Sequence, residues 1–302
     1  MKSAAADATE ELSGATSRNR IAADIAELVK ARLTLLVLLT TAVGYYLGLR
    51  GEFEALALFH VVFGTALAAG GAAALNQWWE RQLDALMHRT RERPIPAGRI
   101  HARDALLLGS LLSIAGVVYL AIACNALSAW LAALTIVLYN FAYTPLKRIS
   151  TANTLVGAIP GAIPPVIGWA AARGELAVGA WCLFAILFFW QMPHFFALSW
   201  MYRGDYARAG FRMVSSGDES GARSSSQSVL FCMGLLIASG TPTHIGLTNA
   251  AYLGVATLLS ALFTAAAMRF HQRRTAKDAR NLFLASIIYL PLLLAALVLT
   301  KR

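Results

Sequence analysis

The sequence has little charge for its length. Only 14% of its 302 residues are Asp, Glu, Lys or Arg, whereas 58% are hydrophobic, and the mean hydropathy is +0.58. A soluble globular domain carries about a quarter of its residues as charged side chains, so this composition excludes that class. The balance indicates an integral membrane protein.

Other patterns are also lacking. The three cysteines, Cys124, Cys182 and Cys232, show no CxxC spacing and lie in or beside apolar stretches, which argues against a disulfide framework or a zinc site. The net charge of +10 is spread over short connectors, so it forms no continuous basic surface for a nucleic acid. No apolar stretch of signal-peptide type precedes Leu33.

Long apolar runs dominate the chain, and nine of them approach the length needed to cross about 30 Å of hydrocarbon. The predicted fold is therefore all-α, a polytopic membrane bundle of nine transmembrane helices. Residues 1–26 are expected to be a mobile cytoplasmic tail and residues 27–302 a single transmembrane domain. The nine predicted spans are Leu33–Leu49, Ala55–Leu75, Ala105–Ala123, Leu127–Tyr143, Thr154–Ala172, Ala177–Trp200, Val229–Ile245, Ala250–Met268 and Leu282–Thr300.

The basic residues predict the orientation of these spans. With nine alternating spans, only Arg50, Arg173, Lys301 and Arg302 of the 26 basic residues fall on one side. The side that carries the excess is cytoplasmic by the positive-inside rule. We therefore expect an inner-membrane protein with a cytoplasmic N-terminus, a periplasmic C-terminus and both long polar connectors, Glu80–Arg103 and Tyr202–Ser228, in the cytoplasm.

One polar pattern stands out where the second span leaves the membrane. Asn76, Glu80 and Asp84 recur every fourth residue, so on a helix they drift by only ~40° per step and lie on one face. An amide and two carboxylates are oxygen ligands that suit Mg²⁺. The alternative is an ordinary helix end at which polar residues meet water. We favour a Mg²⁺–diphosphate site.

Further charged residues occur on the same predicted face. Asp205 follows the sixth span and provides a second acidic position. Arg89, Arg93 and Lys147 could bind a diphosphate, the arginines through paired N–H donors and the lysine as a point charge. Each of these basic residues could equally be an ordinary positive-inside residue.

Two unusual stretches lie within predicted spans. His194, beside Pro193, could be a packing residue, a haem contact or a proton-handling group. The stretch Gly157–Gly168 is rich in glycine and proline, which suits either a cavity wall or close helix packing.

Five separate stretches are distinctive when taken in order along the chain. They read N-Q-W-W-E-R-Q-L-D-A-L-M-H-R-T-R-E-R-P-I-P, Y-T-P-L-K-R, G-A-I-P-G-A-I-P-P-V-I-G-W, W-Q-M-P-H-F and D-Y-A-R-A-G-F-R-M. Together they resemble the UbiA-type intramembrane prenyltransferases, and within that family the branch that farnesylates haem. The resemblance extends from about Glu27 to the last span.

The resemblance implies a function and a site. The reaction would be transfer of a farnesyl group from farnesyl diphosphate to a vinyl group of haem B with addition of water, giving haem O for terminal oxidases. Haem A synthase or oxidase assembly factors would then be partners, with no nucleic acid involved. The residues implied are Asn76, Glu80, Asp84 and Asp205 for Mg²⁺ and catalysis, Arg89, Arg93 and Lys147 for the diphosphate, and His194 for haem.

The sequence departs from the family pattern in places. Ala31 stands where proline is usual, Gly204 where an acidic residue is common and Arg212 where proline is frequent, and Ser215–Ser226 is less basic than usual. These changes would weaken the second metal-binding motif. Two rival functions remain at this stage, prenylation of an aromatic quinone precursor and transport across the membrane.

Overall fold

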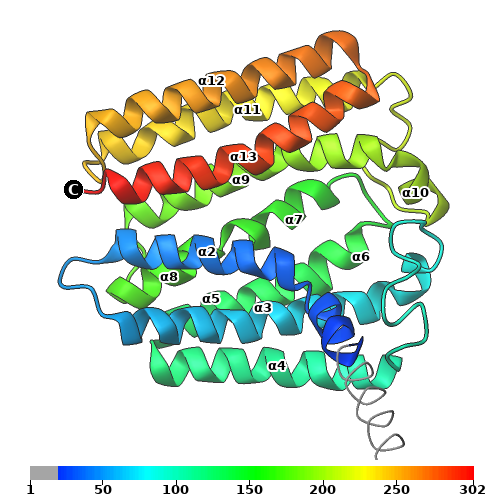
Figure 1. The fold of residues 1–302 in the computed structure, drawn as a ribbon, viewed down its shortest axis with the longest axis horizontal. Coiled ribbons are helices and arrows are strands. Elements are labelled where there is room, and N and C mark those ends of the chain that lie inside the picture. Colours follow the sequence, from blue (N-terminus) through cyan, green and yellow to red (C-terminus); the bar gives the residue numbers. More distant parts are fainter. Residues whose placement is uncertain (1–19) are drawn as a thin grey trace, which may run out of the picture.

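The computed structural model describes residues 20–302, and these residues form a bundle of long helices (Figure 1). The predicted tail, residues 1–26, falls mostly on residues 1–19, which lie outside the described part. Residues 20–28 are helical, and Leu28 is fully buried against Ala74 and Ala105. Defined structure thus begins before the predicted domain boundary.

The elements follow the predicted spans closely, and most of the differences lie at their ends. They are α2 (Ala31–Gly48), α3 (Ala55–Asp84), α4 (Ala102–Ala123), α5 (Ala126–Val137), the π-helix η1 (Leu138–Tyr143), α6 (Thr144–Leu146), α7 (Asn153–Ala162), α8 (Pro164–Arg173), α9 (Val178–Met201), α10 (Arg203–Arg208), α11 (Ala222–His244), α12 (Ala250–Arg273) and α13 (Ala276–Leu299).

Eight helices within residues 20–302 are long and apolar enough to cross a bilayer. The continuous segment α5–η1–α6 and the broken pair α7–α8 each count as one of them. The predicted span that is not among these eight, Val229–Ile245, corresponds to α11, which begins at Ala222 and so includes serines that we expected in the connector. Ser224, Ser225 and Ser228 are fully buried, so one face of the first two turns of α11 packs inside the protein.

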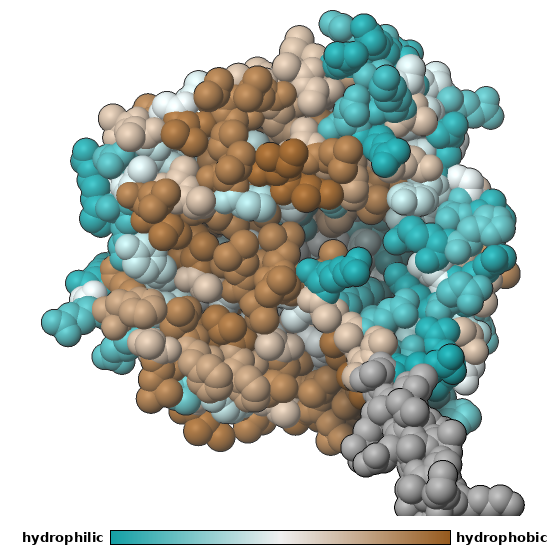
Figure 2. Space-filling model, in the orientation of Figure 1, coloured by the Kyte–Doolittle hydropathy of each residue, from teal (hydrophilic) through white to brown (hydrophobic). Residues whose placement is uncertain are grey.

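The outer surface agrees with a membrane setting. Figure 2 shows hydrophobic residues over the sides of the helices and hydrophilic residues gathered at the end that holds α10 and the long connectors. Large apolar side chains such as Leu35, Ile122 and Leu299 are exposed along the helices. In water they would be unfavourable, whereas in lipid they meet a matching environment.

The opposite end of the bundle is fixed by the few basic residues expected there. Arg173 Nε donates to the Gly48 carbonyl at 2.7 Å, and Lys301 Nζ donates to the Tyr46 and Leu49 carbonyls at 2.6 and 3.0 Å. These carbonyls lie at the C-terminal end of α2, where basic side chains are suitable caps. Arg50 pairs with Glu175 nearby in the same region.

The helices α2 and α8 approach each other especially closely. A Cβ atom on Gly168 would overlap the Thr41 carbonyl oxygen, and one on Gly44 would overlap the Pro165 carbonyl. Small residues allow two helix backbones to meet where larger ones would hold them apart. Part of the Gly157–Gly168 stretch therefore serves packing, as one of the two interpretations held.

We expect Gly168→Ala to destabilise the protein by about 1–3 kcal/mol, because the added methyl must push α2 away from α8. Thermal unfolding of the detergent-solubilised protein would measure this. Gly254→Ala on α12 is the matched control, since nothing lies within 4 Å of its added Cβ, and it should leave the melting temperature unchanged or slightly raised. Equal melting temperatures for the two variants would contradict the close α2–α8 contact.

Candidate active site

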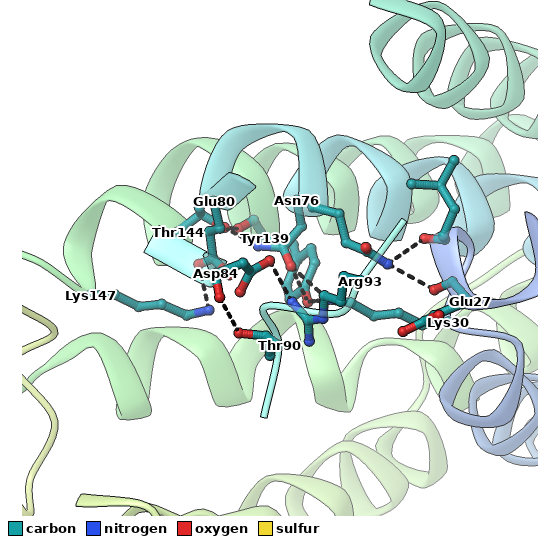
Figure 3. Close-up of polar contacts among 12 residues, drawn as sticks. Glu27, Lys30, Asn76, Glu80, Asp84, Thr90, Arg93, Tyr139, Thr144 and Lys147 are labelled. Carbon is teal, nitrogen blue, oxygen red and sulfur yellow. Dashed lines mark hydrogen bonds and ion pairs between the residues drawn. The ribbon is translucent and has the colours of Figure 1, made fainter. Parts of the chain in front are cut away.

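The polar face of α3 is turned into the protein. Asn76, Glu80 and Asp84 are buried, with exposed fractions of 0%, 4% and 0%, on the last turns of the 30-residue helix. Their four-residue spacing brings them to one side, where they meet side chains from three other segments (Figure 3). The helix-end interpretation, in which these residues meet bulk water, does not fit this burial.

Asn76 is held on both sides of its amide. Its Oδ1 accepts a hydrogen bond from Lys30 Nζ at 2.6 Å and a longer one from the Tyr139 hydroxyl at 3.4 Å. Its Nδ2 donates to Thr144 Oγ1 at 2.9 Å. The amide oxygen therefore points towards Lys30, and its orientation is fixed because the nitrogen has its own acceptor.

Each carboxylate on this face has a basic partner. Glu80 Oε1 lies 2.6 Å from Lys147 Nζ, and Asp84 Oδ2 lies 2.7 Å from an Arg93 guanidinium nitrogen. The backbone carbonyl of Asp84 accepts from Thr90 Oγ1 at 2.9 Å, which holds the connector against the end of α3. Charges buried this deeply are tolerated only when they are paired.

The basic side chains respond to this setting in opposite ways. Burial is the largest single influence on Lys147 and lowers its pKa, but the Glu80 carboxylate together with Tyr143 and Tyr139 outweighs burial, so the net effect raises the pKa. Burial and the positive charge of Arg93 lower the pKa of Lys30 to about 7. Lys30 bonds the neutral side chains of Asn76 and Tyr139, whereas Lys147 contacts a carboxylate directly. An anion placed beside Lys30 would favour its charged form.

The backbone at Lys30 is unusual as well. Its φ of 50° lies in the left-handed region, which residues other than glycine rarely adopt. This residue joins the helix of residues 20–28 to α2, so the turn redirects the chain and brings the lysine to Asn76. Such strain is often found at functional sites.

An apolar cavity extends from this polar cluster into the bundle. Its volume is about 310 Å³, within the range of small-molecule sites. Lys30, Tyr139 and Tyr143 line one part of it, and Gln191 and His194 on α9 line another. Aliphatic and small residues make up much of the remaining wall: Leu33, Leu36, Val37, Ala69, Ala72, Ala73, Gly157, Pro160, Gly161, Pro164 and Leu187.

The glycine- and proline-rich stretch therefore also forms part of the cavity wall, as the second interpretation held. The break between α7 and α8 lies at Ile163. Gly161 leaves room for the Gln191 side chain, because a Cβ there would overlap Gln191 Oε1. Gln191 Nε2 in turn donates to the Ala158 carbonyl at 3.2 Å, which ties α9 to α7.

The second acidic position has a basic partner of its own. Asp205 on α10 is buried and pairs with Arg208 on its own helix. Between residues 20 and 302, no three Asp, Glu, His or Cys side chains are grouped as metal ligands. The neighbouring Tyr206 packs with Phe211 and Met87, so the connector after α9 contacts the connector after α3.

The remaining predicted residue, Arg89, lies on the Asp205 side of the site. It is exposed, and its guanidinium lies 5.2 Å from the Tyr202 ring centroid and 6.0 Å from that of Tyr206. Arg93 and Lys147, by contrast, contact the α3 carboxylates directly. The structure thus separates the three predicted diphosphate ligands into an inner pair and one outer residue.

The donor set fits a divalent cation. Asp84 Oδ1 is buried without a hydrogen-bond partner, although a buried carboxylate oxygen normally has one. It lies on the same helix face as the Glu80 carboxylate and the Asn76 amide oxygen, all oxygen donors of the kind Mg²⁺ prefers. The site has three basic side chains, Lys30, Arg93 and Lys147, and two carboxylates. An anion bound together with the metal could therefore pair with a basic side chain.

Comparison with known proteins decides the family. Residues 37–290 match the UbiA prenyltransferase family. The chain belongs to this family. The resemblance noted in the sequence is thereby confirmed, and so is the all-helical bundle.

The similar members of the UbiA family reported below share the same name. A "Protoheme IX farnesyltransferase" of Solibacter usitatus is 44% identical over 92% of this chain and 98% of its own length. One of Opitutus terrae is 45% identical over 92% of this chain and 94% of its own length.

Solved structures of the family show the same fold. A UbiA homolog from Aeropyrum pernix K1 has a TM-score of 0.71 at 18% identity, covering 88% of this chain and 97% of the other. A UbiA homolog from Archaeoglobus fulgidus, bound to GPP and Mg²⁺, has a TM-score of 0.65 at 14% identity, covering 91% and 99%.

Sequence reasoning did not identify Lys30, Tyr139, Tyr143 or Thr144 as members of the site. The last three lie in η1 and at the start of α6. A π-helix often marks a functional position, but the apolar sequence of this segment does not predict that a π-helix forms there. For Lys30 a signal existed, since a lysine directly before an apolar span could have been weighed as more than a topology determinant.

We expect Lys147→Met to destabilise the protein by roughly 3–5 kcal/mol, because it leaves the buried Glu80 carboxylate unpaired. The double variant Lys147→Met with Glu80→Gln should recover much of this loss, since no lone charge remains. Thermal unfolding in detergent measures both effects. Arg50→Met at the exposed Arg50–Glu175 pair is the control and should cost at most about 1 kcal/mol. Additive effects of the two site substitutions would argue against their coupling.

Proposed function

We propose that this protein transfers the farnesyl group of farnesyl diphosphate to a vinyl group of haem B, with addition of water, giving haem O and diphosphate. One observation carries the proposal: a buried amide–carboxylate face with three basic partners adjoins an apolar cavity through Lys30 and Tyr139, which bond Asn76 and line the cavity. A substrate with a charged head and a hydrocarbon tail matches both parts. The activity named for relatives that match 92% of the chain supports the haem acceptor.

Asn76, Glu80 and Asp84 would hold Mg²⁺, and Asp205 would contribute from α10. When bound, the metal supplies Lewis-acid stabilisation of the charge that develops on the departing diphosphate. Arg93 and Lys147 already contact the carboxylates, so they can donate to diphosphate oxygens held beside these carboxylates. Lys30 adds a third donor at the point where the cavity begins, and Arg89 would reach the diphosphate from the outer side.

The cavity would hold the prenyl chain and the acceptor. Its apolar walls, including Leu33, Val37 and Ala69, keep water from the allylic carbon while the bond to diphosphate breaks. Without this exclusion, water would capture the farnesyl cation before the vinyl group does. His194 lines the same cavity, and we assign to it the contact with haem.

For localisation, we propose the inner membrane, with the N-terminus and the diphosphate site on the cytoplasmic side and the C-terminus on the periplasmic side. The excess of basic residues at the site end of the bundle supports this orientation. The product would pass to haem A synthase or to terminal oxidase assembly factors within the same membrane.

The reaction itself can be tested with purified protein in lipid nanodiscs. Haem B and farnesyl diphosphate should give haem O and diphosphate when Mg²⁺ is present, and little of either when it is removed with EDTA. Haems would be separated by chromatography and identified by mass. Conversion of a quinone precursor but not of haem B would overturn the proposed acceptor.

We expect Asp84→Asn to lower haem O formation by about 100-fold or more, because an amide removes the charge that holds the metal. The protein should still insert into the membrane, as quantified by its level in the membrane fraction. Asp104→Asn is the matched control, since Asp104 is an exposed carboxylate in the first turn of α4. Turnover of Asp84→Asn at the level of this control would refute the site.

A further inference from the structure

His194 is anchored from a helix distant in sequence. Its Nδ1 lies 2.7 Å from Ser286 Oγ on α13. The imidazole also stacks on Trp190, with ring centroids 5.4 Å apart, and lies against Phe283 at 4.7 Å. The ring is therefore fixed in position by three neighbours, and two of these come from α13.

Counting hydrogen atoms gives the protonation pattern of this pair. Ser286 Oγ donates to the Phe283 carbonyl at 2.5 Å. A serine hydroxyl has a single hydrogen to donate, so towards His194 it must accept. Nδ1 of His194 therefore carries a hydrogen, and in the neutral ring the lone pair is on Nε2.

The other ring nitrogen is left accessible. Within residues 20–302, Nε2 of His194 has no hydrogen-bond partner, and it is not among the fully buried polar atoms that lack one. His194 lines the cavity, whereas Ser286 does not. The backbone of Ser286 contributes as well, because its carbonyl accepts from Trp190 Nε1 at 2.9 Å and so fixes the ring that stacks on the imidazole.

We propose that Ser286 is a positioning residue for the acceptor substrate: it holds His194 as the Nδ1–H tautomer, so that Nε2 can bind the iron of haem B. This inference rests on the proposed function, since it assumes haem as the acceptor. Neutral imidazole is a common ligand of haem iron. A hydrogen bond from its other nitrogen fixes the tautomer and the orientation of the ring. The pair thus sets where the porphyrin lies relative to the farnesyl donor.

The test is a titration of the purified, full-length protein in nanodiscs with ferric haem B, followed by absorption and electron paramagnetic resonance spectra. Wild-type protein should give the spectrum of histidine-ligated iron, and His194→Ala should lose it. Ser286→Ala should weaken haem binding by roughly 10- to 100-fold, the usual cost of losing such a partner. Ser286→Thr retains the hydroxyl and should retain most of the affinity.

A double variant separates positioning from general damage. If Ser286 acts through His194, then His194→Ala with Ser286→Ala should bind haem as His194→Ala does. Ser239→Ala is the matched control, because Ser239 is also fully buried and its hydroxyl bonds Tyr289 of α13 at 2.8 Å. That variant should bind haem like the wild type.

The outcomes distinguish this inference from the function it rests on. Wild-type affinity and spectrum in Ser286→Ala, or an equal loss on adding Ser286→Ala to His194→Ala, would overturn the positioning role. If the wild-type protein forms haem O but His194→Ala gives the same spectrum as the wild type, the iron contact alone is overturned. A wild-type protein that neither binds nor converts haem B would remove the proposed function together with the inference.

Discussion

Two carboxylates buried at the end of α3 depend on basic side chains that reach them from other segments. Glu80 and Asp84 are almost completely enclosed, and isolated buried charges are costly enough to prevent folding around them. Lys147 and Arg93 remove that cost by direct pairing, and Lys30 completes the set through Asn76. The arrangement of the start of α2, the end of α6 and the connector after α3 follows from this requirement.

The paired charges form the polar end of the site, and the site becomes apolar with distance from them. The charged cluster lies at the C-terminal end of α3, beside the connector that follows it, and the apolar cavity leads from Lys30 in this cluster towards His194 on α9. Figure 2 shows hydrophilic residues at the end of the bundle that holds the connectors. A prenyl diphosphate has the same change of polarity along its length. Charge attraction at one end and apolar contact at the other can therefore orient the prenyl donor, with its diphosphate beside the basic side chains and its hydrocarbon chain among aliphatic side chains.

The connectors link the two acidic positions indirectly. The Arg212 N–H donates to the Lys147 carbonyl at 2.7 Å, and Lys147 Nζ lies 5.6 Å from the centroid of Phe211. Lys147 therefore contacts both Glu80 and the chain that follows Asp205. A residue other than proline at position 212 is required for this link, because proline has no N–H to donate. The departure from the family pattern at Arg212 thus has a structural role here.

Much of the architecture could be predicted from the sequence. The apolar runs gave the spans within a few residues, because crossing a bilayer demands a minimum length of apolar helix. The four-residue spacing of Asn76, Glu80 and Asp84 placed them on one face, since helical geometry is local. The larger differences were at α3, which continues beyond Leu75 to Asp84, and at α11, whose serines looked like connector but are buried by packing that composition does not reveal.

What the sequence alone determined is the local part: which segments are helices, which residues share a face and which side chains carry charge. Only the tertiary structure decided which charges meet. Lys30 lies 46 residues from Asn76 along the chain and Ser286 lies 92 from His194, and such partners are chosen by how helices pack. Packing depends on the shapes of all neighbouring side chains at once, so no short stretch of sequence contains it.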